Sequence, residues 1–497
     1  MPGKTPNTSR HLEVERKFDV VESTPSPSFA GLTAITRIAK QPPLTLDAVY
    51  FDTPTYDLAS RRITLRRRTG GEDAGWHLKL PAGPDARTEV RAALNDGQSG
   101  TGEDVPDELR DVVLAIVRNR PLQPIARITT TRNVQLLQDG DGAVVAEFCD
   151  DDVTAGLADR SAEQRWREWE IELVAPGTVA NTELLDRLSD RMLGAGATPA
   201  RHVSKLVRAL GGPVVQQDSP GPDTDPLRYA VAEQIDELLV WDRAVRADTD
   251  DAIHQMRVAI RKIRSLMQAS PDAFGLTDNP WILDELRELG RVLGAARDAE
   301  VLAERYQQAL DRLSPELAHG RVRERLVDEE RHRYQTGLEQ SLTALRSQRY
   351  FRLLDALDAV VAQPPPRAPK SPVIVEAAYK RVHKAAKTAV KASEEHRNAA
   401  LHKIRKRAKR LRYTAAATGA TKVSKRAKAV QTLLGEHQDS VVSREHLCQQ
   451  AVVAHAAGED TFTYGLLYQQ EADLARRCRR KLGKALRKLD KAVRKGK

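Results

Sequence analysis

The sequence predicts a multidomain protein of α+β class, in which antiparallel strands come first and helices follow. The chain has 497 residues, roughly two to three times the length of a typical domain. Up to about residue 210, short alternating runs are interrupted by Gly and Pro, a pattern typical of antiparallel strands. From residue 227 onward, Ala, Leu, Glu, Arg and Lys recur at helical period with almost no strand signal.

The strand region begins at residues 11–20, and each later strand is expected in a short run of its own. These runs are YFDTPTYDLAS, ITLRRRTGG, WHLKLPAG, ARTEVRAAL and, near the end, REWEIEL. Helical spacing appears over 105–120 and over 181–210. The Gly- and Pro-rich stretch 211–226 predicts a linker, and a second break at 363–372 divides the helical region into halves, 227–362 and 373–497.

The net charge of +10 is concentrated at the C-terminal end. Residues 371–497 hold 30 Lys and Arg against 11 Asp and Glu, whereas both earlier parts of the chain are slightly acidic. Such a surplus predicts a polyanionic partner: nucleic acid, an acidic membrane surface or a phosphate polymer. The three cysteines lack metal-ligand spacing, and no apolar run is long enough for a membrane span or a signal peptide. We therefore expect a cytoplasmic protein.

Charged residues in the strand region alternate with apolar ones. Glu13, Glu15 and Lys17 share one face of a strand, because successive side chains point to opposite sides. The same pattern recurs in later strands, at Arg66 with Arg68, His77 with Lys79, Glu89 with Arg91, and Glu168 with Glu170 and Glu172. Leu65, Leu78, Ile171 and Leu173 take the opposite faces. A sheet divided in this way can curl into a barrel with a charged interior.

Such an interior suits phosphate chemistry. Arg and Lys pair with phosphate oxygens, and carboxylates at alternate positions bind hard divalent cations. A metal ion that bridges phosphates neutralises charge and lowers the pKa of an attacking water. Acidic and basic clusters inside one barrel therefore indicate metal-assisted cleavage of a triphosphate.

Five motifs in this order give the region a family resemblance: ExExK at Glu13, then YFDT, LRRR, a strand lysine and a late ExE. Residues 9–210 resemble the CYTH or triphosphate tunnel metalloenzyme family. The resemblance implies a closed eight-stranded antiparallel barrel that acts on triphosphates with Mg²⁺ or Mn²⁺.

The resemblance also implies roles for individual residues. The implied metal ligands are Glu13, Glu15, Glu170, Glu172 and Asp151, with Asp150 competing for the last position. The implied phosphate-binding and mid-barrel residues are Lys17, Arg66, Arg68, Lys79, Glu89, Arg91, either Arg132 or Arg127, and Lys205. The implied catalytic set is Glu13, Glu15, Lys17, Glu170 and Glu172.

The helical region contains an internal repeat. The pattern H-x2-R-x3-[RK]-[KR]-x-R begins at His254 and again at His402, and each copy is followed by LGxxxD. Its first, fourth, eighth and eleventh positions share one face of a helix. Four stacked cations repel each other unless an anion or a neighbouring acid, such as Asp298 or Asp439, lies against them. The cationic surroundings favour neutral imidazoles in the free protein and do not suit metal ligands.

This half resembles the CHAD family, a conserved histidine α-helical domain, over most of 226–497. The resemblance implies two pseudo-symmetric helical bundles that face each other across a basic groove and bind inorganic polyphosphate. The implied contact residues are His254, Arg257, Arg261, Lys262, Arg264, His402, Arg405, Lys406, Lys409, Arg410 and Arg412.

Two function classes follow from the sequence. The first is an Mg²⁺- or Mn²⁺-dependent triphosphatase whose helical domain binds polyphosphate, and the second is a non-catalytic polyphosphate-binding protein associated with granules. Nucleic-acid binding is disfavoured, because aromatic residues make up only 4% of the chain and no base-reading motif is present. The adenylyl cyclase activity known in some CYTH members stays open as a further alternative.

Overall fold

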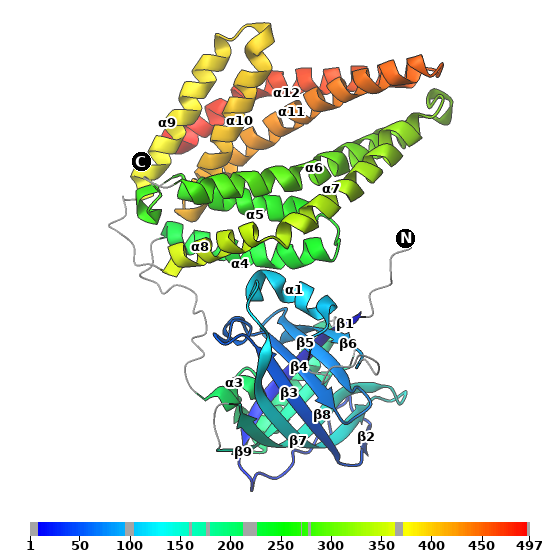
Figure 1. Ribbon diagram of the computed structural model, residues 1–497, viewed down its shortest axis with the longest axis vertical. Helices are drawn as coiled ribbons and strands as arrows, with labels where there is room; N and C mark the ends of the chain where they lie inside the picture. The colour runs from blue at the N-terminus through cyan, green and yellow to red at the C-terminus, as the bar shows by residue number, and fades with distance from the viewer. Residues whose placement is uncertain are drawn as a thin grey trace. The chain divides into compact units, whose positions relative to one another are not determined.

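The computed structural model describes residues 8–94, 104–158, 162–174, 179–211, 226–269, 271–276, 280–362 and 371–494. The chain divides into two compact units, residues 1–218 and 219–497 (Figure 1). The expected linker, 211–226, lies outside the described residues except for its first and last positions.

Eight strands of the first unit close into an antiparallel barrel. Their order is β1, β6, β5, β4, β3, β7, β8 and β9, and β9 pairs back onto β1 (Figure 1). The bounds are β1 (Thr8–Val20), β3 (Leu44–Asp52), β4 (Thr64–Thr69), β5 (Gly75–Pro81), β6 (Ala86–Ala92), β7 (Gln123–Gln138), β8 (Val144–Leu157) and β9 (Gln164–Leu173). Two short strands extend the sheet: β2 (Arg37–Lys40) pairs with β7, and β10 (Thr198–Pro199) pairs with β1. The closed barrel that the resemblance implied is confirmed.

The barrel turns its apolar face outward and its charged face inward. Phe18, Trp169 and Ile171 pack beneath helix α2 (Val179–Gly194), where they form a buried cluster with Leu185 and Leu188. Burial of this outer face removes apolar surface from water and stabilises the closed sheet. Because side chains alternate along each strand, the charged residues between these apolar positions are forced into the interior.

Helix α3 (Lys205–Leu210) fills one end of the barrel. The hydroxyl of Ser204 accepts a hydrogen bond from the Val207 N–H at 3.2 Å and caps the helix. Leu206 packs in one cluster with Ile128 and Val153, which alternate in phase with the inward-facing side chains of β7 and β8. The apolar contacts of α3 therefore close this end of the interior.

Two expectations for the first unit were wrong in part. The helical pattern over 105–120 gives α1 (Asp107–Val117), but the pattern over 181–210 is broken between α2 and α3. Gly196 adopts a φ of +99°, a conformation that favours glycine, and the chain then pairs with β1 through β10. Tertiary strand pairing thus overrides local helix propensity here.

The second correction concerns the run YFDTPTYDLAS, which is strand only as far as Asp52. The buried Asp52 carboxylate accepts hydrogen bonds from the N–H groups of Leu58 and Ala59, both at 2.9 Å. These bonds fold the next residues back into a turn, because a side-chain acceptor satisfies backbone donors that a strand partner would otherwise take.

The second unit is helical, as predicted. Its helices are α4 (Pro226–Arg246), α5 (Ala252–Met267), α6 (Trp281–Leu310), α7 (Glu329–Leu345), α8 (Gln348–Ala362), α9 (Ser371–Val390), α10 (Glu394–Ala417), α11 (Thr421–Ala456) and α12 (Phe462–Arg494). In each half, three successive helix pairs pack together: α4 with α5, α5 with α6 and α6 with α7, then α9 with α10, α10 with α11 and α11 with α12. No helix in the described part of the chain is long and apolar enough to cross a bilayer.

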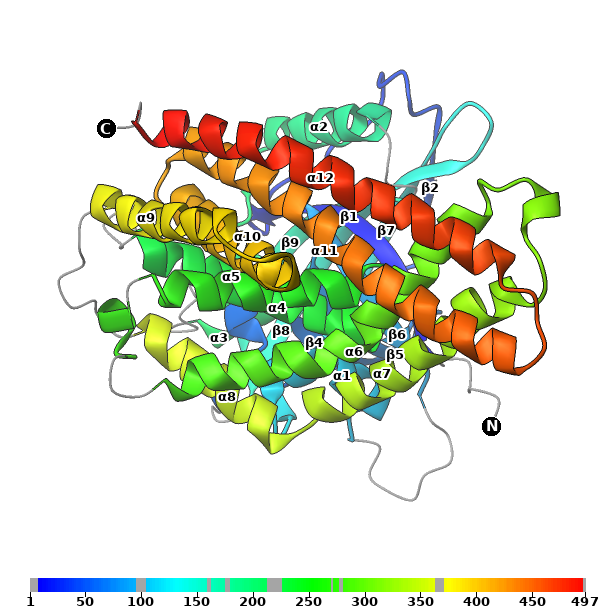
Figure 2. The ribbon, with the colours of Figure 1, turned by 90° about the horizontal axis from the view of Figure 1, so that it is seen from above.

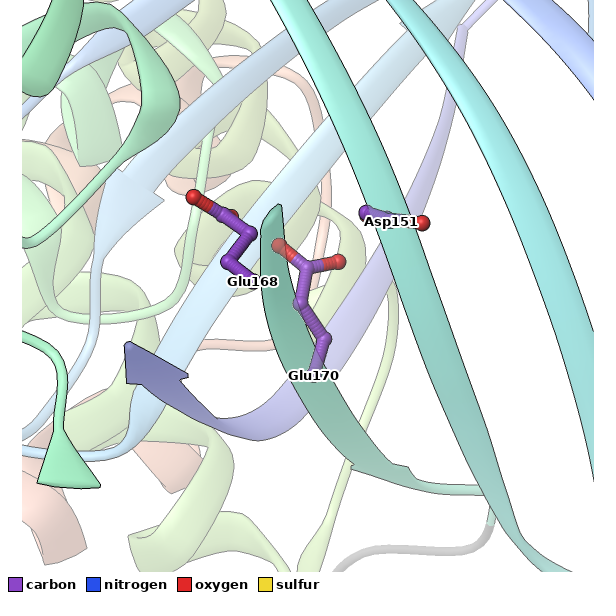
Figure 3. Close-up of side chains that lie close together, drawn as sticks. All are labelled: Asp151, Glu168 and Glu170. Atoms are coloured by element: carbon purple, nitrogen blue, oxygen red, sulfur yellow. The ribbon is translucent and has the colours of Figure 1, made fainter. Parts of the chain in front are cut away.

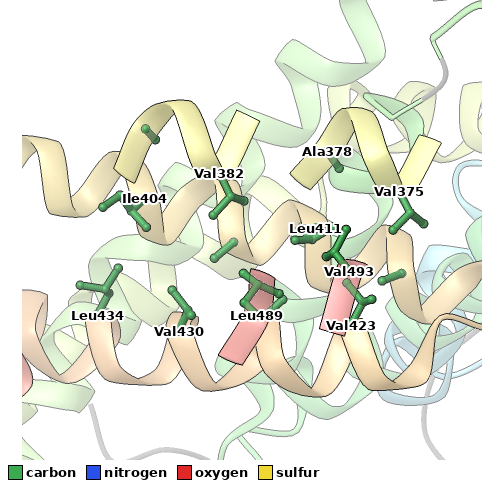
Figure 4. Close-up of a cluster of buried hydrophobic side chains, with 14 of the residues drawn as sticks. Val375, Ala378, Val382, Ile404, Leu411, Val423, Val430, Leu434, Leu489 and Val493 are labelled. Atoms are coloured by element: carbon green, nitrogen blue, oxygen red, sulfur yellow. The ribbon is translucent and has the colours of Figure 1, made fainter. Parts of the chain in front are cut away.

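The second half of this unit has a continuous apolar core. Ile404 and Leu411 of α10 meet Val430 and Leu434 of α11 in a cluster to which α9 and α12 also contribute (Figure 4). The inward positions of α10 recur at helical spacing, so its cationic positions are left on the opposite side. This core therefore fixes where the basic face of α10 points.

Two long helical hairpins, α6–α7 and α11–α12, extend from the halves, and α11 lies along α12 (Figure 2). A buried cluster joins the hairpins, with Tyr306 and Leu310 from α6 and Leu447 from α11. Helices α6 and α7 cross closely at Gly337, where an added Cβ would lie 2.6 Å from the backbone nitrogen of Ala296. This glycine is required by the close approach of the two backbones.

Candidate functional site

The interior of the barrel holds a cavity of about 630 Å³. Its charged lining comes from many strands and from α3: Arg10, Glu13, Glu15, Lys17, Arg66, Arg68, Asp73, Lys79, Arg87, Glu89, Arg91, Arg132, Glu147, Glu170, Glu172 and Lys205. The volume is in the range of small-molecule sites. The strand alternation predicted from the sequence therefore brings the acidic and basic residues together in one enclosed space.

Arginines crowd one part of this lining. Burial, together with the positive charge of Arg66 and Arg132, lowers the pKa of Arg68 to about 9. The Arg66 guanidinium donates a hydrogen bond to the Tyr50 hydroxyl at 3.3 Å. Arg68 is ion-paired with Asp73. Cations held this close together and this far from water favour an anion that lies between them.

Three buried carboxylates, Asp151, Glu168 and Glu170, lie close together on β8 and β9 (Figure 3). The Lys205 ammonium lies 2.9 Å from Asp151, 2.7 Å from Glu168 and 2.7 Å from Glu170. Arg132 adds ion pairs with Asp151 at 2.7 Å and with Glu170 at 2.6 Å. The carboxylates stand close enough together to share a cation. In the folded chain, that cation is the ammonium of Lys205.

The pKa of Glu170 reflects this neutralisation. Burial opposes ionisation of Glu170, but Lys17, Lys205 and Arg132 outweigh it and hold its pKa well below the usual range. Burial likewise opposes ionisation of Glu15, yet Lys17 and Lys79 lower its pKa to about 2. Both carboxylates are therefore ionised and already paired with cations of the protein.

A second group of carboxylates lies across the neighbouring strands β1, β9 and β8. Glu172 is the direct cross-strand partner of Glu15 on β1 and of Glu147 on β8, so three carboxylates stand in one row across adjacent strands. Burial raises the pKa of Glu172 to about 7, and the nearby charges of Glu13 and Glu15 act in the same direction. Burial also raises the pKa of Glu13, against the effect of Lys79. Like charges placed side by side are destabilising unless a cation joins them.

The carboxylates of the barrel suit a divalent metal ion, because carboxylate oxygens are the ligands that Mg²⁺ and Mn²⁺ prefer. Burial is the largest cause that raises the pKa values of Glu13 and Glu172, and Glu13 is also paired with Lys79. Among the described residues, the oxygens of Asp151, Glu168 and Glu170 lie close enough together to hold one metal ion. Glu13, Glu15 and Glu172 line the same cavity as Glu170.

The remaining residues nominated on β5 and β6 also lie inside. Lys79 pairs with Glu13 at 2.6 Å, and Arg91 pairs with Glu89. The buried His77 is hydrogen-bonded to Glu89, with Nδ1 at 2.9 Å from the carboxylate. Burial lowers the pKa of His77 to about 4 despite the opposing effect of Glu89, so the imidazole is neutral at pH 7.

The barrel distinguishes between the residues in the two positions for which the sequence left a choice. Arg132 points into the cavity, whereas Arg127 lies outside it, 70% exposed and paired with Asp47 at 2.6 Å. Asp151 points inward, whereas Asp150 pairs with Arg167 at 2.7 Å on the other face. Arg127 is therefore not a residue of the cavity.

Four residues of the site were missed as candidates. Glu168 shares the inward face of REWEIEL and contacts Lys205, and Glu147 completes the carboxylate row. Arg87 lies 3.6 Å from Glu15, and Tyr50 binds Arg66. The strand alternation already contained the signal for Glu168. Arg87 alternates in phase with Glu89 and Arg91, so the same signal contained it, whereas Cys149 separates Glu147 from Asp151 on their shared face and Tyr50 carries no charge.

In the second unit, α5 packs against α10 and brings the two repeat copies together. We name the α5–α10 basic cluster by its residues Arg257, Arg261, Arg405, Lys409 and Arg412. Burial and the charges of Arg261 and Arg405 lower the pKa of Lys409 to about 6. Burial also lowers the pKa of Arg261 to about 10, although it donates a hydrogen bond to a tyrosine of α10. The positive charge around Lys409 and Arg261 is therefore only partly compensated.

The glycine of each LGxxxD motif lies against one arginine of the repeat copy that precedes it. An added Cβ on Gly294 would lie 3.4 Å from the Arg257 guanidinium, and one on Gly435 would lie 3.5 Å from that of Arg405. Asp298 then accepts a hydrogen bond from Arg257 at 3.2 Å. The glycine leaves room for the guanidinium to lie against the neighbouring helix, and the acid orients it.

The other nominated residues of the repeat occupy the same two helices. Lys262 and Arg264 lie on α5, and Lys406 and Arg410 on α10, where Arg410 donates a hydrogen bond to Gln268 beyond the end of α5. Burial lowers the pKa of His254 to about 4 and also lowers that of His402. Both imidazoles are therefore neutral at pH 7.

Comparison with known proteins agrees with this division. The CYTH domain model matches residues 11–197, and the CHAD domain model matches residues 229–448. The uncharacterized proteins MT2285 and Rv2226 from two strains of Mycobacterium tuberculosis are each 63% identical to the chain and cover 100% of it and 99% of their own length.

Two solved structures are similar at lower identity. PptA from Streptomyces chartreusis is 20% identical, covering 53% of this chain and 98% of its own, with a TM-score of 0.46. The CHAD domain from the plant Ricinus communis is 24% identical, covering 53% and 90%, with a TM-score of 0.40. On the family matches and the 63% identity over its whole length, the chain belongs to the proteins in which a CYTH domain is followed by a CHAD domain.

Proposed function

We propose that the first unit is a divalent-metal-dependent phosphohydrolase that acts on inorganic triphosphate or a related short triphosphate. The observation that carries this proposal is the lining of the cavity by both cations and carboxylates. Arginines crowd one part of it, while a row of carboxylates centred on Glu172 lies across β1, β9 and β8. A triphosphate bound between them meets cations along its chain and a metal-ligand set beside it.

The cationic residues bind and orient the substrate. Arg66, Arg68 and Arg132 present guanidinium groups whose geometry matches phosphate oxygens. Glu13, Glu15, Asp151, Glu170 and Glu172 would hold the metal ion, which would supply charge neutralisation and a water of lowered pKa. Helix α3 excludes bulk water from one end of the cavity, which strengthens each of these electrostatic contacts.

Phosphate release by the full-length chain tests the proposal. Inorganic triphosphate with Mg²⁺ or Mn²⁺ should yield phosphate, and EDTA should abolish the reaction. Glu172→Gln keeps the size of the side chain but removes a ligand charge, so the rate should fall by about 100-fold or more. Glu163→Gln, at an exposed glutamate just before the same strand, should leave the rate unchanged.

The outcomes separate the candidate activities. Triphosphate binding without release by the wild-type chain would contradict hydrolysis and leave a binding protein. Cyclic AMP formed from ATP would instead identify a cyclase. Loss of activity in both variants would show that the glutamine substitution itself disturbs the fold.

We further propose that the second unit binds inorganic polyphosphate through the α5–α10 basic cluster, and that this binding places the protein at polyphosphate granules. The support is the collection of half-buried cations whose pKa values burial and mutual repulsion lower, as at Lys409 and Arg261. A linear polyanion relieves that repulsion. Titration calorimetry should show salt-dependent binding of polyphosphate, weakened in Arg405→Gln, whereas displacement by duplex DNA at equal charge would refute specificity.

A further inference from the structure

The guanidinium of Arg68 already has an anionic partner inside the barrel. Arg68 is buried on β4, and it forms an ion pair with Asp73 in the short connection of residues 70–74 between β4 and β5. Both residues line the cavity. The Asp73 side chain is 36% exposed, whereas that of Arg68 is 8% exposed. The carboxylate can therefore leave the pair toward water, while the guanidinium stays in the cavity.

Buried contacts hold the backbone at Asp73. The Nε2 atom of His77 lies 2.9 Å from the carbonyl oxygen of Asp73, and its Nδ1 atom lies 2.9 Å from Glu89 on β6. His77 and Glu89 are each 1% exposed. Gly70 and Gly71 turn the chain with φ values of +81° and +77°, conformations that favour glycine. Two glycines and a buried histidine thus fix the connection, and with it the position of the carboxylate.

Arg68 also keeps a donor for a ligand. Its buried Nε makes no hydrogen bond with any residue that the structure describes, and the same is true of the Nε of Arg66. Arg66 and Arg132 repel the charge of Arg68, so an anion that binds all three is favoured. Carboxylate and phosphate oxygens accept hydrogen bonds from a guanidinium in the same geometry. A phosphate group that uses Arg68 fully must therefore take the place of the Asp73 carboxylate.

We propose that Asp73 is an internal competitor of the substrate in the barrel. Its carboxylate holds Arg68 while the cavity is empty, and a phosphate group of the triphosphate displaces it. The free energy of the displaced pair is subtracted from the binding of every anion that uses Arg68, and anions that bind elsewhere are unaffected. Asp73 acts through Arg68 and does not contact the reacting atoms, so it is a positioning residue. The inference rests on the triphosphate site proposed for the first unit, but it does not depend on hydrolysis, because displacement precedes any reaction.

Titration calorimetry of the full-length chain with inorganic triphosphate tests the displacement. EDTA is present, so that binding is measured without turnover, and the ionic strength is about 0.15 M, which screens charges that do not touch the ligand. Asp73→Asn keeps the size of the side chain but removes its charge, and triphosphate should bind about three- to tenfold more tightly. Glu72→Gln is the matched control, because it removes the same charge from an exposed neighbour in the same connection. Its effect should stay below about twofold.

A double-mutant cycle locates the effect at Arg68. Arg68→Gln by itself should weaken triphosphate binding, because a phosphate contact is lost. In that background Asp73→Asn should tighten binding no more than Glu72→Gln does, since the competitor has lost its target. In phosphate-release assays with Mg²⁺, Asp73→Asn should lower KM by a factor similar to that in calorimetry. Its kcat should stay within about twofold of the wild type, because Asp73 has already left Arg68 in the bound complex.

Two results would overturn the inference: triphosphate binding by Asp73→Asn that is no tighter than binding by Glu72→Gln, or an equal gain from Asp73→Asn when Arg68 is already replaced. Asp73→Ser should give the same gain as Asp73→Asn, because the missing charge and not the new amide is the cause. Failure of the wild type to bind triphosphate would remove the proposed site of the first unit as well. Binding without phosphate release would contradict the proposed hydrolysis and leave the competition at Arg68 in place.

Discussion

Replacement of Lys205 by methionine tests whether this residue is the internal cation of the barrel. The variant keeps the length of the side chain but leaves Asp151, Glu168 and Glu170 without the ammonium that lies 2.7–2.9 Å from each. Loss of one partner of a buried ion pair costs about 3–5 kcal/mol. For a unit of this size, that loss lowers Tm by about 6–20 °C.

The measurement is differential scanning calorimetry of the full-length chain, in which the transition of the first unit should shift. Arg208→Met is the matched control on the same helix, because Arg208 pairs with Asp19 at 2.7 Å near the surface. Its cost should stay below about 1 kcal/mol. Millimolar Mn²⁺ should raise the Tm of Lys205→Met more than that of the wild type, because the three carboxylates can then share a metal ion.

The pH dependence of the same variant has a defined sign. Lys17, Lys205 and Arg132 hold the pKa of Glu170 well below the usual range against the effect of burial. A lowered pKa contributes stability above the pKa of the unfolded state, and that stability is lost as the pH falls. The difference in Tm between wild type and Lys205→Met should therefore shrink as the pH falls below about 4.5, the ordinary pKa of a glutamate. A variant within about 2 °C of the wild type at pH 7 would refute the role of Lys205.

Three further outcomes are expected. Arg132→Leu should lower both the Tm in calorimetry and the affinity for triphosphate, because it breaks a buried ion pair. Arg127→Leu, at a 70% exposed side chain, should cost less than about 1 kcal/mol and should leave phosphate release unchanged. Lys409→Gln should raise Tm yet weaken polyphosphate binding. Burial and neighbouring cations lower the pKa of Lys409 in the folded protein to about 6. The gain in stability of Lys409→Gln should therefore be full below that pH and should shrink as the pH rises toward the pKa of lysine in the unfolded chain. A variant less stable than the wild type would contradict this reasoning. Gly337→Ala should lower Tm by the equivalent of about 1–3 kcal/mol, since its Cβ would lie 2.6 Å from the Ala296 nitrogen, whereas Gly465→Ala on α12, with open space around it, should not.

The basic cluster and the barrel share one physical feature. In both, like charges are gathered where water is scarce, at a cost to the stability of the free protein. The barrel offsets part of this cost with internal pairs such as Lys205 with Glu170, and the helical unit offsets it at Arg257 through Asp298. Burial raises the pKa of Glu172 to about 7, and burial with neighbouring cations lowers that of Lys409 to about 6. Both residues lie in the regions where we propose that ligands bind.

The sequence by itself determined which residues share a face. The alternation of Glu13, Glu15 and Lys17 predicted a charged interior, and the spacing after His254 and His402 predicted two cationic helix faces. Both predictions follow from the period of a single strand or helix, which the order of residues specifies completely. The two-part organisation was visible for the same reason, because the period changes from two to 3.6 after the first unit.

Only the tertiary structure decided which of two opposite faces points inward and which residues meet across elements. Arg127 and Arg132 stand five positions apart on one strand and therefore lie on opposite faces, and closure of the barrel turned Arg132 inward. The contact between Lys205 and Glu170, and the row formed by Glu15, Glu172 and Glu147, depend on strand register and on the docking of α3. Periodicity fixes directions within an element, whereas register and docking arise from apolar burial between elements far apart in the chain.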